Sequence, residues 1–71
     1  MNADVIKGYW KEFAGAAQEQ WGKLTDDDFD EAKGDMKKLE GRLQRLYGYS
    51  AEEARLRLSQ LADRVSRLKA S

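Results

Sequence analysis

The sequence predicts an all-α protein, a small four-helix bundle of two packed α-hairpins, and three observations carry this prediction. Apolar residues recur at spacings of three and four along most of the chain, which places them on one face of a helix. Proline is absent, β-branched residues are few and no segment alternates apolar and polar side chains, so strands are not expected. The glycines repeat in a way that indicates an internal duplication. A chain of 71 residues has room for one domain, which we expect to span residues 1–71.

The duplication rests on two runs of glycines. Each run has a spacing of seven residues, and the second follows the first at an offset of 26: Gly8, Gly15 and Gly22, then Gly34, Gly41 and Gly48. Residues 7–22 align on residues 33–48, and Trp21 then matches Tyr47. Each unit is therefore predicted to form a helix, a glycine-containing turn and a second helix.

Four helices are expected, over about residues 3–21, 26–33, 35–47 and 51–69. The second is the weakest, because Phe29 and Ala32 are its only apolar side chains. With no Cys for a disulfide and no His for a metal site, packing must supply the stability. The residues expected to form the core are Ile6, Trp10, Phe13, Trp21, Leu24, Leu39, Leu43, Tyr47, Leu58, Leu61 and Val65.

Two helix starts have the spacing of a capping box, in which a hydroxyl accepts from a free backbone N–H and a carboxylate reaches back to the cap. Thr25 with Asp28 begins the second helix, and Ser50 with Glu53 begins the fourth. These four residues are the predicted helix caps.

Several glycines are predicted to lie on helix backs, away from the core, at about 100° per residue. Each interior glycine costs a helix about 0.8 to 1 kcal/mol relative to alanine. Either the bare backs let another chain approach closely, or the protein is tuned to a loose, strongly hydrated fold. The candidate contact surface consists of Gly8, Gly15, Gly34, Gly41 and Leu56.

No residues are arranged for catalysis, so we expect a non-enzymatic protein. Asp26, Asp28 and Asp30 occupy the first, third and fifth places of an EF-hand-like loop. The sixth place, however, holds Glu31 instead of glycine, and the twelfth holds Lys37 instead of glutamate. No His or Cys is present as a nucleophile. We expect neither a metal nor another cofactor.

The charges sum to zero but are unevenly distributed. Residues 1–35 hold four basic and nine acidic side chains, whereas residues 36–71 hold nine basic and four acidic ones. Either the two halves attract each other within the fold, or the second half is a basic docking face for nucleic acid. Its basic residues are interleaved with acids, which favours a solvated face.

Several stretches resemble the CsbD-like family of small bacterial general-stress proteins: Met1-Asn2, Ile6-Lys7-Gly8, Trp10-Lys11, Glu19-Gln20-Trp21-Gly22-Lys23-Leu24-Thr25-Asp26-Asp27-Asp28, Gly34-Asp35, Tyr47-Gly48-Tyr49-Ser50 and Glu52-Glu53-Ala54. The resemblance covers about residues 1–55, and the later sequence, rich in Leu and Arg, departs from the family pattern. It implies two roughly orthogonal helical hairpins and production under stress. The family has no established enzymatic activity or ligand, so the resemblance implies a setting and not a mechanism.

Together these observations favour a non-enzymatic stress protein that makes weak protective contacts with a macromolecule of unknown identity. The alternative is a binding module that self-associates or docks nucleic acid through its basic second half. We expect a monomer or weak homo-oligomer without a membrane span. No export signal is visible in the sequence, so we expect a cytoplasmic location.

Overall fold

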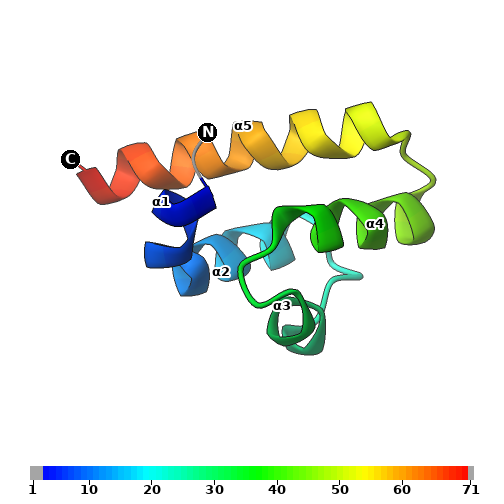
Figure 1. Cartoon of the computed structure of the whole chain (residues 1–71), viewed down its shortest axis with the longest axis horizontal. Helices are drawn as coiled ribbons and strands as arrows, with labels where there is room; N and C mark the ends of the chain where they lie inside the picture. Colours follow the sequence, from blue (N-terminus) through cyan, green and yellow to red (C-terminus); the bar gives the residue numbers. More distant parts are fainter. Residues whose placement is uncertain (1–2, 71) are drawn as a thin grey trace.

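The computed structural model describes the backbone of residues 3–70 and the side chains of residues 6–68. Within that part of the chain there are five α-helices and no strand, which confirms the all-α class (Figure 1). The helices are α1 (Ala3–Gly8), α2 (Trp10–Gln20), α3 (Asp26–Ala32), α4 (Met36–Tyr47) and α5 (Ala51–Ala70).

The first expected helix, over 3–21, is two helices that meet at Tyr9. The backbone of Tyr9 leaves the helical region with φ −115° and ψ 20°, and its N–H donates to the carbonyl of Ile6 at 3.0 Å. Gly8 directly precedes this break and has the lowest helix propensity after proline, so the chain bends there at little cost. The four helices predicted are therefore five.

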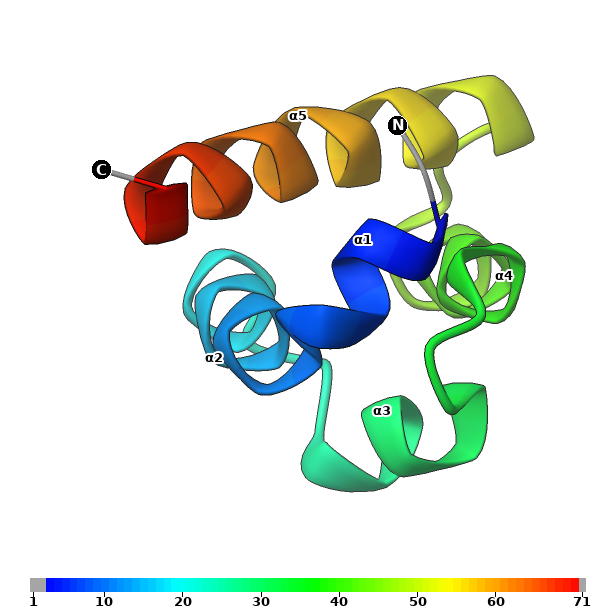
Figure 2. The same cartoon turned by 60° about the vertical axis from the view of Figure 1, so that its left-hand side comes forward.

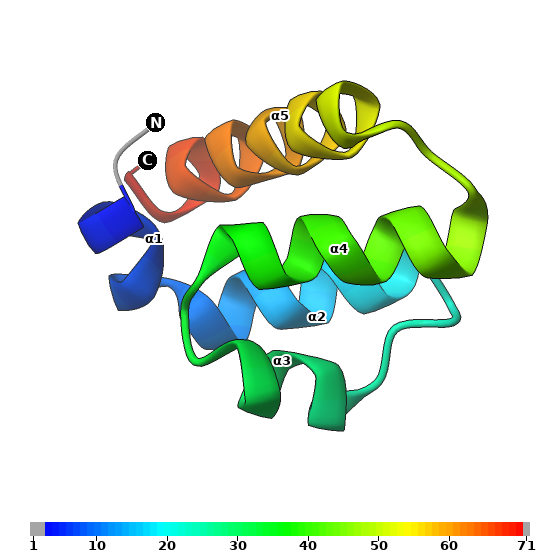
Figure 3. The same ribbon diagram turned by 45° about the vertical axis from the view of Figure 1, so that its right-hand side comes forward.

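The helices are stacked in three levels. Figure 2 looks roughly along α2 and α4, with α5 covering both of them on one side and α3 lying on the opposite side. The closest helix pairs are α4 with α5, α2 with α5, α3 with α4, and α1 with α2. Of the two predicted hairpins, α4 with α5 is also a close packing pair, whereas α3 packs chiefly on α4 (Figure 3). The specific arrangement of two hairpins is thus not confirmed.

Most of the expected core lies inside the molecule. The side chains of Phe13, Leu39 and Leu43 have no exposed surface, and Trp10 and Tyr47 lie half-buried at the edge of the core. The other expected core residues are buried: Ile6, Trp21, Leu24, Leu58, Leu61 and Val65. Every buried residue among those described is apolar, because no polar or charged side chain is enclosed.

Phe29 is a buried core residue, although it is not among the core residues that the sequence predicts. Its ring lies edge-on to Trp10 at 5.7 Å and to Phe13 at 6.4 Å between centroids. The indole Nε1 of Trp10 also donates to the carbonyl oxygen of Phe29 at 3.3 Å. These contacts attach the short helix α3 to α2, although α3 has too few apolar residues to show a stripe of its own.

Side-chain hydrogen bonds are present at both predicted helix starts. Thr25 Oγ1 accepts from the backbone N–H of Asp28 at 3.4 Å, and Asp28 Oδ2 accepts from the N–H of Thr25 at 2.9 Å, which completes the capping box of α3. Ser50 Oγ accepts from the N–H of Glu53 at 3.0 Å at the start of α5. The carboxylate of Glu53 is instead bound to Arg57, one turn further along the helix.

Gly34 does not lie on a helix back, contrary to the prediction. It is buried in the turn between α3 and α4 with φ +86°, and an added Cβ would lie 2.9 Å from Lys7 Cγ. Its conformation and this close approach both require glycine. Gly8, Gly15 and Gly41 fit the prediction, since a Cβ at each would meet no heavy atom within 4 Å.

Replacing Phe13 by alanine should lower the free energy of unfolding by about 3 to 5 kcal/mol, because the fully buried ring leaves a cavity. That loss is comparable with the whole stability of so small a domain. Leu56→Ala is the control, since the side chain of Leu56 is 56% exposed and its removal should change stability by less than about 0.5 kcal/mol. Urea unfolding followed by tryptophan fluorescence measures both. Equal midpoints for the two variants would contradict this core.

Gly34→Ala and Gly41→Ala should shift stability in opposite directions. Alanine at position 34 should cost about 1 to 2 kcal/mol for its left-handed backbone, in addition to the displacement of Lys7. Alanine at position 41 should stabilise by about 0.8 to 1 kcal/mol, because the helix gains propensity and the methyl group meets nothing. Thermal unfolding by circular dichroism compares them, and a rise in Tm for Gly34→Ala would refute the assignment of the turn.

Candidate functional site

Helices α3 and α4 place opposite charges next to each other. The sequence of α3 contains five acids and no base, Asp26, Asp27, Asp28, Asp30 and Glu31. The sequence of α4 contains four bases and a single acid, Lys37, Lys38, Arg42, Arg45 and Glu40. Because α3 packs on α4, acidic residues from the first half of the sequence lie next to basic residues from the second half.

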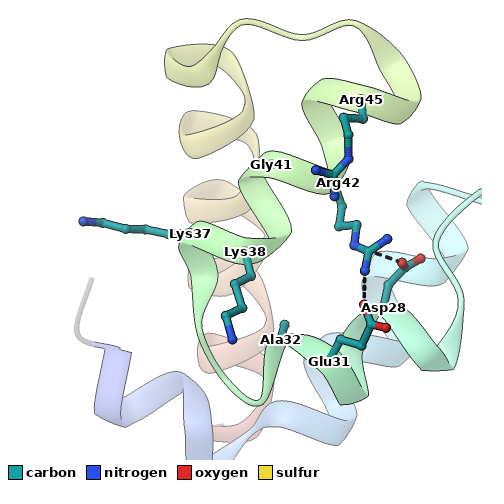
Figure 4. Close-up of a pocket in the computed structure, with 8 residues that line it drawn as sticks. All are labelled: Asp28, Glu31, Ala32, Lys37, Lys38, Gly41, Arg42 and Arg45. Atoms are coloured by element: carbon teal, nitrogen blue, oxygen red, sulfur yellow. Dashed lines mark hydrogen bonds and ion pairs between the residues drawn. The ribbon is translucent and has the colours of Figure 1, made fainter.

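An open cleft of about 400 Å³ lies along the boundary between these acidic and basic residues, and Figure 4 shows the residues that line it. Arg42 reaches across the cleft from α4 to α3. Its Nε lies 3.4 Å from Asp28 Oδ1, and its Nη2 is bound to the carboxylate of Glu31. The side chain of Asp28 is 12% exposed, so its pair with Arg42 is partly shielded from water. Arg42 therefore clamps α3 to α4.

Lys38, Arg42 and Arg45 form what we name the basic stripe, since spacings of four and three residues place them on one side of α4. Lys38 and Arg45 are exposed and line the cleft beside Arg42. Lys37 also lines the cleft, but the end of its side chain extends away from the other residues (Figure 4). Neither Lys38 nor Arg45 forms an ion pair within the described residues. Of these three cations, Arg42 alone is paired with a carboxylate from residues 6–68.

Asp27, Asp30 and Glu31 form what we name the acidic patch on α3. All three are exposed, and of these only Glu31 is ion-paired in the described part of the chain. Asp26 and Asp28 are engaged elsewhere: Asp26 Oδ1 accepts from Gln18 Nε2 at 2.8 Å, and Asp28 caps α3 and contacts Arg42. No group of three or more potential metal ligands is found among the residues that the structure describes.

A second hollow lies on the other side of α3, against α2. It has a volume of about 490 Å³, and Trp10, Ala14, Gly15 and Phe29 supply its apolar lining. Gly15 and Gly41 are equivalent in the predicted duplication, and each lines one of the two hollows that flank α3. The glycine-bearing backs of α2 and α4 are therefore hollow because no side chain fills the space beside α3.

Three aromatic side chains join the C-terminal ends of α2 and α4. Trp21 Nε1 donates to the hydroxyl of Tyr49 at 3.2 Å, and the rings of Tyr47 and Tyr49 stack with centroids 5.7 Å apart. Tyr47 Oη accepts from the backbone N–H of Lys23 at 3.0 Å. Trp21 and Tyr47, which the duplication aligns, thus hold the ends of α2 and α4 together.

Leu56, the remaining residue of the predicted contact surface, lies on α5 and lines neither hollow beside α3. The structure places Gly15 and Gly41 on either side of α3, Gly8 at the end of α1 and Gly34 in a buried turn. The five residues therefore do not make one surface. Arg42, Asp28 and Glu31, which do meet, come from segments whose spacing carries no local signal of contact.

Comparison with known proteins assigns the family. A family model described as CsbD-like matches residues 4–55, which includes α2, α3 and α4. The chain belongs to the CsbD-like family. No solved structure gives a significant match to it. Among the described residues, no helix is both long and apolar enough to span a membrane.

Bacterial relatives align with most of the chain. The UPF0337 protein PA4738 of Pseudomonas aeruginosa is 48% identical over 65 residues, covering 92% of this chain and all of the relative. The UPF0337 protein ECA0631 of Pectobacterium atrosepticum is 54% identical over 54 residues, 76% of this chain and 78% of that one. The UPF0337 protein YjbJ of Escherichia coli K12 is 48% identical with the same coverage. The Pseudomonas alignment is long enough to extend beyond residue 55 into α5.

Asp28→Ala should destabilise this CsbD-like protein more than Glu31→Ala does. Asp28 caps α3 and contacts Arg42, so its loss should cost about 1 to 2 kcal/mol. The side chain of Glu31 is 64% exposed, and its pair should be worth less than about 1 kcal/mol. Chemical denaturation gives both values, and a larger effect at Glu31 would show that the clamp depends on the exposed pair.

Proposed function

We propose that this CsbD-like protein is a non-enzymatic, cytoplasmic stress protein that protects other macromolecules by weak, reversible contacts. The observation that carries the proposal is the separation of apolar interior from charged exterior. All buried residues of the described part are apolar, while 37% of the chain is charged with a net charge of zero and the mean hydropathy is −0.85. Membership of the CsbD-like family, with small bacterial relatives, supports the same proposed function.

The physical basis of protection is contact without stable complex formation. Exposed ion pairs contribute about 0.2 to 1 kcal/mol each, so a surface of mixed charges binds many partners briefly and none tightly. Such a hydrated surface between client proteins keeps their exposed apolar patches apart while water is removed. A small size helps, because more molecules of the protector are present at a given mass.

Enzyme-inactivation assays test the proposal. We expect a labile enzyme that is dried or frozen with this protein to retain more activity than the same enzyme with an inert globular protein at equal mass. Added salt during the incubation should reduce the protection, because it screens the exposed charges. Retained activity no greater than with the inert protein would refute the protective role.

A glycine variant separates the two explanations for the bare helix backs. Gly15→Ala combined with Gly41→Ala fills open positions and strengthens α2 and α4. If loose folding underlies protection, the stabilised variant should protect less. If close approach of another chain underlies it, protection should fall because the methyl groups block that approach. Ala51→Gly distinguishes the two explanations, because it lowers helix propensity at an exposed position away from both hollows. It should increase protection if loose folding matters and leave protection unchanged if close approach matters.

Docking of nucleic acid is the second candidate function, and the exposed cations of the basic stripe favour it. Phosphate contacts release counterions, so a DNA mobility shift should weaken steeply as salt rises. The carboxylates of α3 beside the stripe oppose such docking, as do the pairs that Arg42 and Arg57 form with acids. For that reason protective contact is the function we favour.

A further inference from the structure

The basic stripe of α4 and the acidic patch of α3 have opposite charges and meet at the Arg42 clamp, and the patch continues around α3 to Asp30, which lines the second hollow. Arg42 lies at the boundary between these two halves and is already bound to Asp28 and Glu31. Beyond that boundary, Lys38 and Arg45 on one side and Asp27 and Asp30 on the other are exposed and form no ion pair within the described residues. The surface therefore has unsatisfied charges of both signs.

A partner that satisfies this surface must itself carry both signs. A polyanion placed on the basic stripe would approach the carboxylates of the acidic patch, and a polycation on the patch would approach the stripe. Like charges brought together at an interface cost binding energy and suppress such partners. The complement of the surface is an acidic region beside a basic region, and a second copy of the same chain presents it.

We propose that two copies of this protein associate through the basic stripe and the acidic patch. A two-fold axis along the boundary between the halves lays each stripe on the patch of the other copy, so the same contacts form twice. This isologous arrangement is the commonest one in soluble homo-oligomers. Gly41 lies in the cleft between the halves without a side chain, which leaves room for the partner's side chains there. The association is independent of the protective role proposed above.

The contacts are exposed ion pairs, so the dimer should be weak and sensitive to salt. Sedimentation equilibrium at about 0.05 M salt should show a mass that rises with protein concentration toward twice that of the monomer. Raising the salt to about 0.5 M shortens the Debye length to less than half and should raise the dissociation constant about tenfold or more. A salt-independent association would exclude this surface as its basis.

Two charge-reversed variants give the decisive test. Lys38→Glu with Arg45→Glu makes both halves acidic, and Asp27→Lys with Asp30→Lys makes both halves basic. Each variant alone should be a monomer, because like charges now face each other. An equimolar mixture should associate again at least as strongly as the unchanged protein, because each half meets its opposite. Circular dichroism verifies that both variants remain helical.

Arg55→Glu with Arg64→Glu is the matched control, since it makes the same charge change on α5 and should leave association unchanged. Lys38→Gln with Arg45→Gln replaces the first variant if charge reversal impairs folding, and it should weaken association without abolishing helicity. A monomeric protein at millimolar concentration and low salt would overturn the proposal. So would folded variants whose mixture stays monomeric, or a DNA shift that depends on Lys38 and Arg45 in a protein that does not self-associate.

Discussion

Burial of apolar side chains among α2, α4 and α5 is the interaction on which the rest of the structure depends. The chain has no disulfide and no His or Cys to hold a structural metal, and no polar side chain is enclosed among the described residues. Apolar packing must therefore offset most of the conformational entropy that the chain loses on folding. A domain of this size buries a smaller fraction of its surface than a larger one, so the net free energy of folding is small. Fully buried Phe13, Leu39 and Leu43 lie at its centre, and α5 supplies the cover with Leu58 and Leu61.

The same constraint is met differently in the two predicted units. The first contains α1, α2 and the seven-residue α3, whereas the second contains α4 and the twenty-residue α5. The stripe on α5 is long enough to cover both α2 and α4, whereas α3 offers only Phe29 and Ala32 to the core. Polar contacts add to the attachment of α3, namely the Arg42 clamp and the bond from Trp10 Nε1. Most of its other side chains are exposed to solvent, so their charge affects which partners bind to the molecule.

The charged groups lie at the surface, because every buried side chain among residues 6–68 is apolar. The two hollows beside α3 exist where Gly15 and Gly41 carry no side chain, and they differ in charge because α4 lines one with basic residues whereas α2 lines the other mainly with apolar ones. Family membership places the chain among bacterial relatives of similar length. The juxtaposition of the basic stripe with the acidic patch is specific enough to test with single pairs of residues.

The sequence alone determined the helical class, the apolar stripes and the capping box at Thr25, because each is encoded by residues within one or two helical turns of each other. It also placed Gly15 and Gly41 correctly on open helix backs. Only the tertiary structure decided the break at Tyr9, the left-handed turn at Gly34 that packs on Lys7, and the meeting of Arg42 with Asp28 and Glu31. Those features depend on contacts between segments that are distant in the sequence. The apolar pattern is compatible with several arrangements of the helices, and only the detailed packing of side chains in the core determines which one forms.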